Sequence, residues 1–363
     1  MVLSLLFKPR DLKAVLTLMR AAKRRGISVE ELGDVLTPAE MAALVLPPSG
    51  AEKFGLVPDA EVSADPFLDD PALDAARAGA RAGDWTAAAR LLAGTGTEWD
   101  RRARIVGELA SVAADDDGWL RAWRAARPDD PHAAVVHAES LVRLAWQIRG
   151  GQTADRTTAA QFSGFHSVLV EAEKAARHAV DLLPADPTPW LSLVTMARGL
   201  QLGHDRFATI WRGLLERAPH HRQGHGQALQ YWCAKWAGSA ERMFAFAEEA
   251  AAKSPALLGL PLQAALEHQG EDRGIWKSAG TRRALDALLE RLAGEGADDV
   301  ALRSDRGFAA YALVENKRYP EAVEQFRMLG ARADAGPWSS FEEPRLVFLT
   351  TRATACRKAR RRS

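Results

Sequence analysis

This chain has little cysteine, no excess of charge of either sign and no long apolar run. Its two cysteines, Cys233 and Cys356, exclude a disulfide framework and a cysteine-based zinc site. The 48 basic residues nearly balance the 47 acidic ones, whereas nucleic-acid-binding domains carry a basic excess. No apolar run approaches the ~20 residues of a membrane-spanning helix. The apolar start Met1–Phe7 ends at Lys8, without the longer core or the cleavage site of a signal peptide. We therefore expect a cytoplasmic protein with no nucleic-acid partner and no transmembrane segment.

Tyrosine and asparagine are also scarce, with three tyrosines and a single asparagine, Asn316. A sheet protein would be rich in valine, isoleucine, threonine and tyrosine. This chain is instead rich in alanine, the strongest helix former, and has 11 tryptophans with large apolar surfaces. The hydrophobic share of 47% is enough to build a core, which excludes a disordered chain. We predict an all-α protein, and the 363 residues suggest two domains or one repetitive array.

Charge is balanced in total but unevenly placed. Residues 1–25 contain seven basic residues and one acidic residue, residues 26–75 contain eleven acidic residues and only Lys53, and the end of the chain is basic again. One interpretation is a solvated basic helix, an acidic linker and a basic tail. Another is a basic amphipathic helix that meets an acidic partner or an anionic surface. Self-association is a further possibility: residues 59–74 of one chain could dock on residues 8–25, or on the tail, of another, or fold back within the same chain.

Turn residues divide the chain into three parts. Residues 1–46 form the first, an N-terminal helical unit with two predicted capping boxes, Ser28–Glu31 and Thr37–Glu40. Residues 47–70 contain several prolines and glycines and no helical period, so we predict an acidic linker there. Residues 71–363 form the third part, a domain without a convincing strand. Its predicted helices cover 72–82, 86–93, 98–115, 118–127, 132–148, 157–182, 188–202, 205–218, 223–236, 239–253, 257–268, 279–293, 298–315, 320–331 and 343–360.

Prolines at the ends of these helices reveal a repeat. Pro184, Pro219 and Pro255 follow one another at intervals of 35 and 36 residues. The 34-residue tetratricopeptide repeat, a helix–turn–helix unit with an early aromatic residue, has a closely similar period. The segment from Pro184 to Pro219 resembles it, with Trp190 and Trp211 as predicted plugs between helices. The fold we predict is therefore a tetratricopeptide-like α-solenoid of irregular helix pairs, with an irregular helical bundle as the alternative.

The turns between paired helices follow the same pattern elsewhere. Gly83-Asp84-Trp85 and Lys317-Arg318-Tyr319 each resemble the turn of a tetratricopeptide repeat.

The stretch 233–247 resembles something narrower, the Lys-Trp-Gly-Gly-Ser signature of the uncharacterised bacterial domain of unknown function 4034 family. The matching positions are Lys235, Trp236, Gly238, Ser239, Met243, Phe246 and Ala247, whereas Ala237 departs from the first glycine of the family. The resemblance covers 40–60 residues and implies no known activity. The residues themselves predict a turn at Gly238, a helix cap at Ser239 and a buried helix face after it.

Catalytic signatures are missing from the sequence. It contains no Walker loop, no His-Glu-x-x-His and no Gly-x-Ser-x-Gly, so we predict a non-enzymatic protein without a cofactor. His220, His221 and His225 are weak candidates for a metal site, because residues four apart share a helix face. Their place after Pro219 fits a solvated junction between repeats equally well. A helical metal-dependent enzyme is thus the least favoured reading.

Tryptophan and basic residues predict a binding groove over residues 140–240. Tryptophan often anchors protein interfaces, and the inner surface of a solenoid is built from the first helix of each pair. With basic neighbours, such a surface would suit an acidic peptide or a terminal carboxylate. The predicted groove residues are Arg143, Trp146, Arg149, Trp232, Lys235 and Trp236. The alternatives are that these tryptophans belong to the core, or that the array senses a small molecule in a helical pocket. The favoured function is a scaffold that binds a protein or peptide.

Overall fold

A computed structural model describes residues 12–36, 49–65, 70–150, 157–296 and 302–359. The fold over these ranges is all-helical, as predicted, and the only β contact found within them is an isolated bridge between Ser63 and Arg332. The search of the described helices for one long and apolar enough to cross a membrane found none.

Two compact units divide the chain, and their boundaries differ from the predicted ones. Residues 67–264 form the first, here called the middle unit, and residues 1–66 with 265–363 form the second, the terminal unit. The predicted repeat domain, 71–363, is therefore split within α15 (Leu260–His268). The predicted N-terminal unit, 1–46, and linker, 47–70, fall largely into the terminal unit, because the segment after residue 49 packs on the last helix of the chain.

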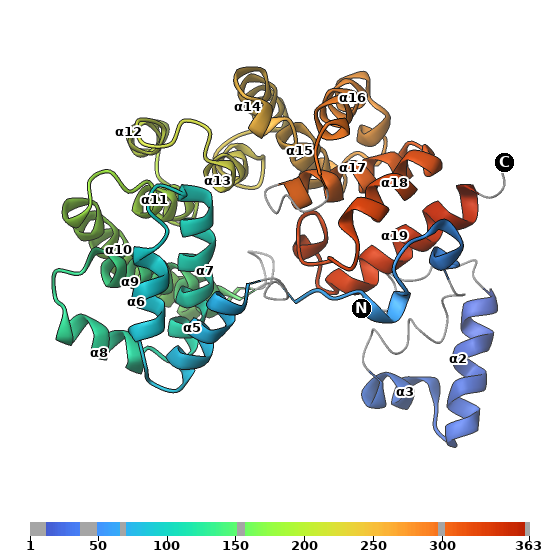
Figure 1. The fold of residues 1–363 in the computed structure, drawn as a ribbon, viewed down its shortest axis with the longest axis horizontal. Coiled ribbons are helices and arrows are strands. Elements are labelled where there is room, and N and C mark those ends of the chain that lie inside the picture. Colours follow the sequence, from blue (N-terminus) through green and yellow to red (C-terminus); the bar gives the residue numbers. More distant parts are fainter. Residues whose placement is uncertain (1–11, 37–48, 66–69, 151–156, 297–301, 360–363) are drawn as a thin grey trace. The chain divides into compact units, whose positions relative to one another are not determined.

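Helix pairs in sequence order build the middle unit (Figure 1). Its helices are α5 (Pro71–Arg81), α6 (Thr86–Ala93), α7 (Trp99–Asp115), α8 (Gly118–Ala126), α9 (Pro131–Arg149), α10 (Ala159–Leu182), α11 (Thr188–Gly199), α12 (His204–Leu215), α13 (Arg222–Trp232) and α14 (Ala240–Lys253). Most lie within a few residues of the predicted ranges. The members of each pair pack on one another, and the first helices α5, α7, α9 and α11 also contact the next first helix along the chain.

Local signals in the sequence fix where these helices begin. Asp70 and Asp130 accept hydrogen bonds from the first-turn backbone of α5 and α9, each followed by a proline that is preset for the helix. Thr158 forms a capping box with Gln161 at the start of α10. Ser239 caps α14, as predicted, and Met243 on that helix is buried. These caps satisfy backbone donors that a helix leaves without partners, so each start is defined locally.

Tryptophans fill the middle unit between alanine-rich helix faces. Trp119 and Trp123, four residues apart on α8, are both buried. Trp211 on α12 packs against His225 of α13, between consecutive helix pairs. Trp190 lies within its own pair instead: a Cβ added to Gly213 of α12 would stand 2.2 Å from its ring. The glycine therefore makes room for the indole.

The terminal unit combines the last helices with the start of the chain. Its helices are α2 (Leu12–Arg25), α3 (Val29–Val35), α16 (Ala279–Ala293), α17 (Arg303–Glu315), α18 (Tyr319–Leu329) and α19 (Pro344–Ala359). Short 3-10 helices occur in this unit at Ala51–Phe54, Asp59–Glu61, Ile275–Lys277 and Trp338–Ser340. Another, Pro255–Leu257, belongs to the middle unit. The capping box of Ser28 and Glu31 is present at α3. The predicted box at Thr37–Glu40 lies outside the described residues.

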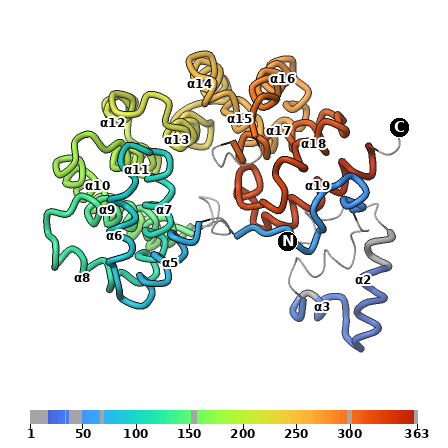
Figure 2. The backbone as a smooth tube through the Cα atoms, viewed as in Figure 1, coloured from blue at the N-terminus to red at the C-terminus, as the bar shows by residue number. Residues whose placement is uncertain are grey.

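The described part of the predicted linker is a packed segment. Residues 49–63 run beside α19 (Figure 2), and Leu56 and Val62 are buried. Arg345 of α19 donates hydrogen bonds to the backbone carbonyls of Asp59 and Val62. Arg352 donates to the carboxylate of Asp59. An acidic residue of this segment thus docks within its own chain, on α19.

Candidate functional site

A cleft of about 550 Å³ lies in the middle unit. The helices that line it are α7, α9, α11 and α13, the first members of four successive pairs. Its lining residues are Ser111, Glu139, Val142, Arg143, Trp146, Gln147, Gly150, Leu191, Thr195, Arg198, Gln223 and Gln227. A solenoid presents its first helices on one continuous surface, so the position of the cleft follows from the order of the helices.

Trp146 and Arg198, which line the cleft, belong to a tryptophan–arginine cluster that also includes Arg149 and Trp236 behind them. The rings of Trp146 and Trp236 meet edge to face, with centroids 5.8 Å apart. The guanidinium carbon of Arg198 lies 4.8 Å from the ring centroid of Trp146, and that of Arg149 lies 5.6 Å from it. Cations within about 6 Å of an indole face are attracted by its electron density. The cluster therefore concentrates positive charge on an aromatic wall.

Glu139, the acidic residue of the lining, already accepts hydrogen bonds from two neighbouring side chains. Glu139 accepts a hydrogen bond from Nε of Arg143 at 3.2 Å through one carboxylate oxygen and from Oγ of Ser192 at 2.7 Å through the other. The guanidinium of Arg143 lies over Gly107 of α7, where an added Cβ would come within 2.8 Å of its Nη2. With Arg143 and Arg198 against Glu139, the charge in the lining favours an anionic group.

The buried polar atoms of the lining residues include the Nε1 donor of Trp146 and the Oε1 acceptor of Gln227, which have no hydrogen-bond partner among the described residues. A buried polar group without a partner costs about 1–3 kcal/mol of stability.

The structure brings four of the six predicted groove residues together. Arg143 and Trp146 line the cleft, and Arg149 and Trp236 pack on Trp146. Trp232 lies apart from them: it packs on Phe207 of α12 and lies parallel to the ring of His204. Lys235 is exposed in the turn after α13. The helix predicted over 223–236 ends at Trp232 instead, so Trp232 and Trp236 do not lie on one helix face.

The tight turn after Trp232 depends on Gly238. The backbone N–H of Gly238 donates to the carbonyl of Cys233, and a Cβ at Gly238 would stand 1.9 Å from the carbonyl oxygen of Trp232. This close approach ends α13 and directs Trp236 toward α9. The sequence predicted the turn at Gly238 but extended the helix before it to residue 236. The helix ends four residues earlier, at Trp232.

Most polar residues of the cleft escaped the sequence analysis, among them Arg198, Gln223 and Gln227. These three lie on first helices, α11 and α13. Their position on first helices is the sequence feature that could have predicted them, because each first helix contributes side chains to the surface that these helices form. Without the contacts between α9, α11 and α13, nothing distinguishes these residues from other polar residues of the same helices.

The histidines of the predicted metal candidate have structural partners. His221 is buried at the start of α13, where its Nδ1 accepts a hydrogen bond from the backbone of Gly224, and burial lowers its pKa. The ring of His225 packs between Trp211 and Phe246, whereas His220 is exposed. In the part of the chain that the structure describes, no group of three histidine, cysteine, aspartate or glutamate side chains is placed to hold a metal ion.

One protein family matches part of the middle unit. None of the curated proteins and none of the solved structures matches the chain. The family model described as Domain of unknown function (DUF4034) matches residues 85–207. This range holds α9 and α11, with ten of the twelve residues that line the cleft, but not the stretch 233–247 that suggested the resemblance. The chain thus contains a segment similar to this uncharacterised family, and that segment carries most of the cleft.

Proposed function

We propose that the middle unit is a non-enzymatic scaffold that binds a protein or peptide in the cleft between α7, α9, α11 and α13. The observation that carries the proposal is the tryptophan–arginine cluster on the wall of a cleft whose lining has more positive than negative charge. Tryptophan and arginine are the residues that most often dominate the binding energy of an interface.

The arrangement of the helices supports a tetratricopeptide-like solenoid as the architecture of this scaffold. First helices contact first helices along the chain, and each packs on its own second helix. Gly83 in the turn between α5 and α6 has a positive φ of 87°, as the turn pattern of the repeat requires. In this reading the cleft lies on the inner surface of the solenoid.

An acidic peptide is the occupant that the chemistry of the cleft favours. A carboxylate can accept paired hydrogen bonds from an arginine, and Arg143 and Arg198 both line the cleft. Gln223 and Gln227 each offer an amide donor and an acceptor, which suits a peptide backbone.

A photo-crosslinking residue in the cleft would test this function. Gln223 is exposed and lines the cleft, so Gln223→p-benzoylphenylalanine would put the reactive group beside a bound segment. The matched control replaces Arg212, which is exposed on α12 and does not line the cleft. We expect mass spectrometry to identify the same protein or peptide repeatedly from the Gln223 position only. Cross-links that are equal at both positions would argue against the proposal.

Binding of the captured segment should then depend on the cluster. We expect Trp146→Ala to weaken binding at least about 30-fold, since hot-spot residues contribute about 2 kcal/mol or more. Arg198→Gln should weaken it about tenfold, and Arg212→Gln should leave it unchanged. Fluorescence anisotropy with a labelled segment gives these affinities. An unchanged affinity in both cleft variants would exclude this cleft as the site.

The size of the cleft favours one second candidate, a small-molecule sensor. Pockets for small ligands measure about 300–1,000 Å³, and the 550 Å³ of this cleft lies in that range. Native mass spectrometry of the gently purified protein distinguishes the two. A small bound mass that is lost in Arg198→Gln would favour the sensor over the scaffold.

A further inference from the structure

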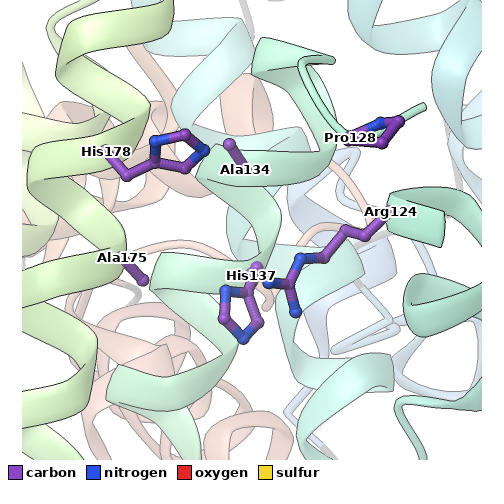
Figure 3. Close-up of a pocket in the computed structure, with 6 residues that line it drawn as sticks. All are labelled: Arg124, Pro128, Ala134, His137, Ala175 and His178. Carbon is purple, nitrogen blue, oxygen red and sulfur yellow. The ribbon is translucent and has the colours of Figure 1, made fainter.

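A second and smaller pocket lies on the other side of α9, between α8, α9 and α10. Its volume is about 140 Å³, and its lining consists of Arg124, Pro128, Ala134, His137, Ala175 and His178 (Figure 3). At 100° per residue, Ala134 and His137 lie on the face of α9 opposite to Arg143 and Trp146. The pocket is therefore separate from the cleft.

Nitrogen-bearing side chains from three helices line this pocket. Arg124 comes from α8, His137 from α9 and His178 from α10. Figure 3 shows the guanidinium of Arg124 reaching toward the ring of His137, with His178 on the neighbouring helix. The other lining residues are alanines and a proline, and no acidic residue is part of the lining. The pocket thus offers hydrogen-bond donors and positive charge without a built-in counter-charge.

The surroundings of His137 show the effect of this charge. Burial, together with the positive charge of Arg124, lowers the pKa of His137 to about 4. Asp117 acts in the opposite direction, but it also pairs with Arg121 at 3.1 Å, and His178 adds to the repulsion. At neutral pH Arg124 is therefore charged beside an uncharged His137, which an anion between them would help to protonate.

We propose that Arg124, His137 and His178 bind one small oxyanion of the phosphate type, either as the free ion or as a phosphate monoester. A water molecule occupies roughly 30 Å³, so the pocket has the volume of about four to five waters. That volume suits one tetrahedral ion and is too small for a drug-sized ligand. Arginine supplies a planar pair of donors for phosphate oxygens, and each histidine supplies a further donor.

Calorimetric titration of the full chain with inorganic phosphate and with O-phosphoserine tests the proposal. We expect saturable binding that tightens as the pH falls from 8 to 6, because the anion stabilises protonated His137. Tighter binding of inorganic phosphate would identify a free-ion site, and equal or tighter binding of phosphoserine would identify a monoester site. No saturable binding of either probe would overturn the proposal.

Matched variants test whether this pocket is the site. Arg124→Gln should weaken binding at least tenfold, whereas Arg212→Gln, exposed on α12 and outside the pocket, should bind as the unmodified chain does. Because Arg124 and His178 are both exposed, Arg124→Gln and His178→Gln should fold normally, which circular dichroism can check. Proton NMR of the histidine rings gives a second readout, since phosphate should raise the pKa of His137. Equal affinities in the Arg124 and Arg212 variants would contradict the site.

Discussion

Single residues decide where the side chains of the cleft point. Trp236 reaches Trp146 because the chain leaves α13 after Trp232 and turns at Gly238, whose missing Cβ makes room for the carbonyl of Trp232. A glycine in a loop is easy to find in a sequence. The clash that any other residue would cause is visible only when the preceding carbonyl is in place.

Substitution of this glycine should be costly. We expect Gly238→Ala to lower the free energy of unfolding by at least about 2 kcal/mol, because the new Cβ would meet backbone atoms, which cannot rotate away. Gly94→Ala is the control, since its Cβ would stand at an ordinary 3.5 Å from the nearest atoms. Urea denaturation followed by circular dichroism measures both. If the two variants were equally stable, the turn would not depend on Gly238.

At the scale of elements, two helical hairpins use the same turn in different units. In each, a residue with positive φ precedes the second helix: Gly83, at 87°, before α6, and Lys317, at 61°, before α18. Glycine adopts this conformation without strain, whereas a lysine there is strained. The sequence pattern predicted both turns. The structure adds the positive φ at Gly83, which explains why a glycine stands there.

The strain in these turns predicts opposite effects of two substitutions. Gly83→Ala should lower the free energy of unfolding by about 1 kcal/mol. Lys317→Gly should leave it unchanged or raise it by less than about 1 kcal/mol, because relief of strain competes with the added freedom of the unfolded chain. Thermal and urea denaturation give both values. A destabilising Lys317→Gly would mean that the lysine side chain makes contacts that outweigh the strain.

Most helices were predictable because their signals are local. Apolar residues at intervals of three and four, capping residues such as Asp130 and breaks at proline define an element within its own sequence. The end of α13 was the notable miss, because the chain leaves the helix there through contacts between Trp232 and Gly238 that the apolar period does not register.

At the scale of the whole molecule, the middle unit contains several histidines whose burial favours the neutral form. Burial is the largest cause that lowers the pKa of His132, His137, His221 and His225. In the unfolded chain each would take up a proton near its ordinary pKa of 6.5. Because the unfolded state then binds more protons than the folded state, stability is lost as the pH falls below about 6.5.

Acid should therefore destabilise the middle unit, and replacement of His137 should remove part of this pH dependence. We expect the free energy of unfolding to fall steadily between pH 6.5 and about 4, where His137 becomes protonated in the folded state. His137→Gln should flatten this dependence, whereas His220→Gln, at an exposed position, should not change it. Urea titrations at a series of pH values measure the slope. Equal slopes for the two variants would show that His137 does not contribute.

The sequence by itself determined the all-helical class, most helix positions, the caps and the turns at Gly83 and Lys317, because these depend on residues close along the chain. Tertiary structure alone decided the division into two units and the assembly of the cleft. Asp59 docks on Arg345 and Arg352, nearly three hundred residues away, so a segment with the composition of a linker becomes part of a unit. Trp146, Arg198 and Trp236 likewise meet only because their segments pack together, and no local pattern specifies such a contact.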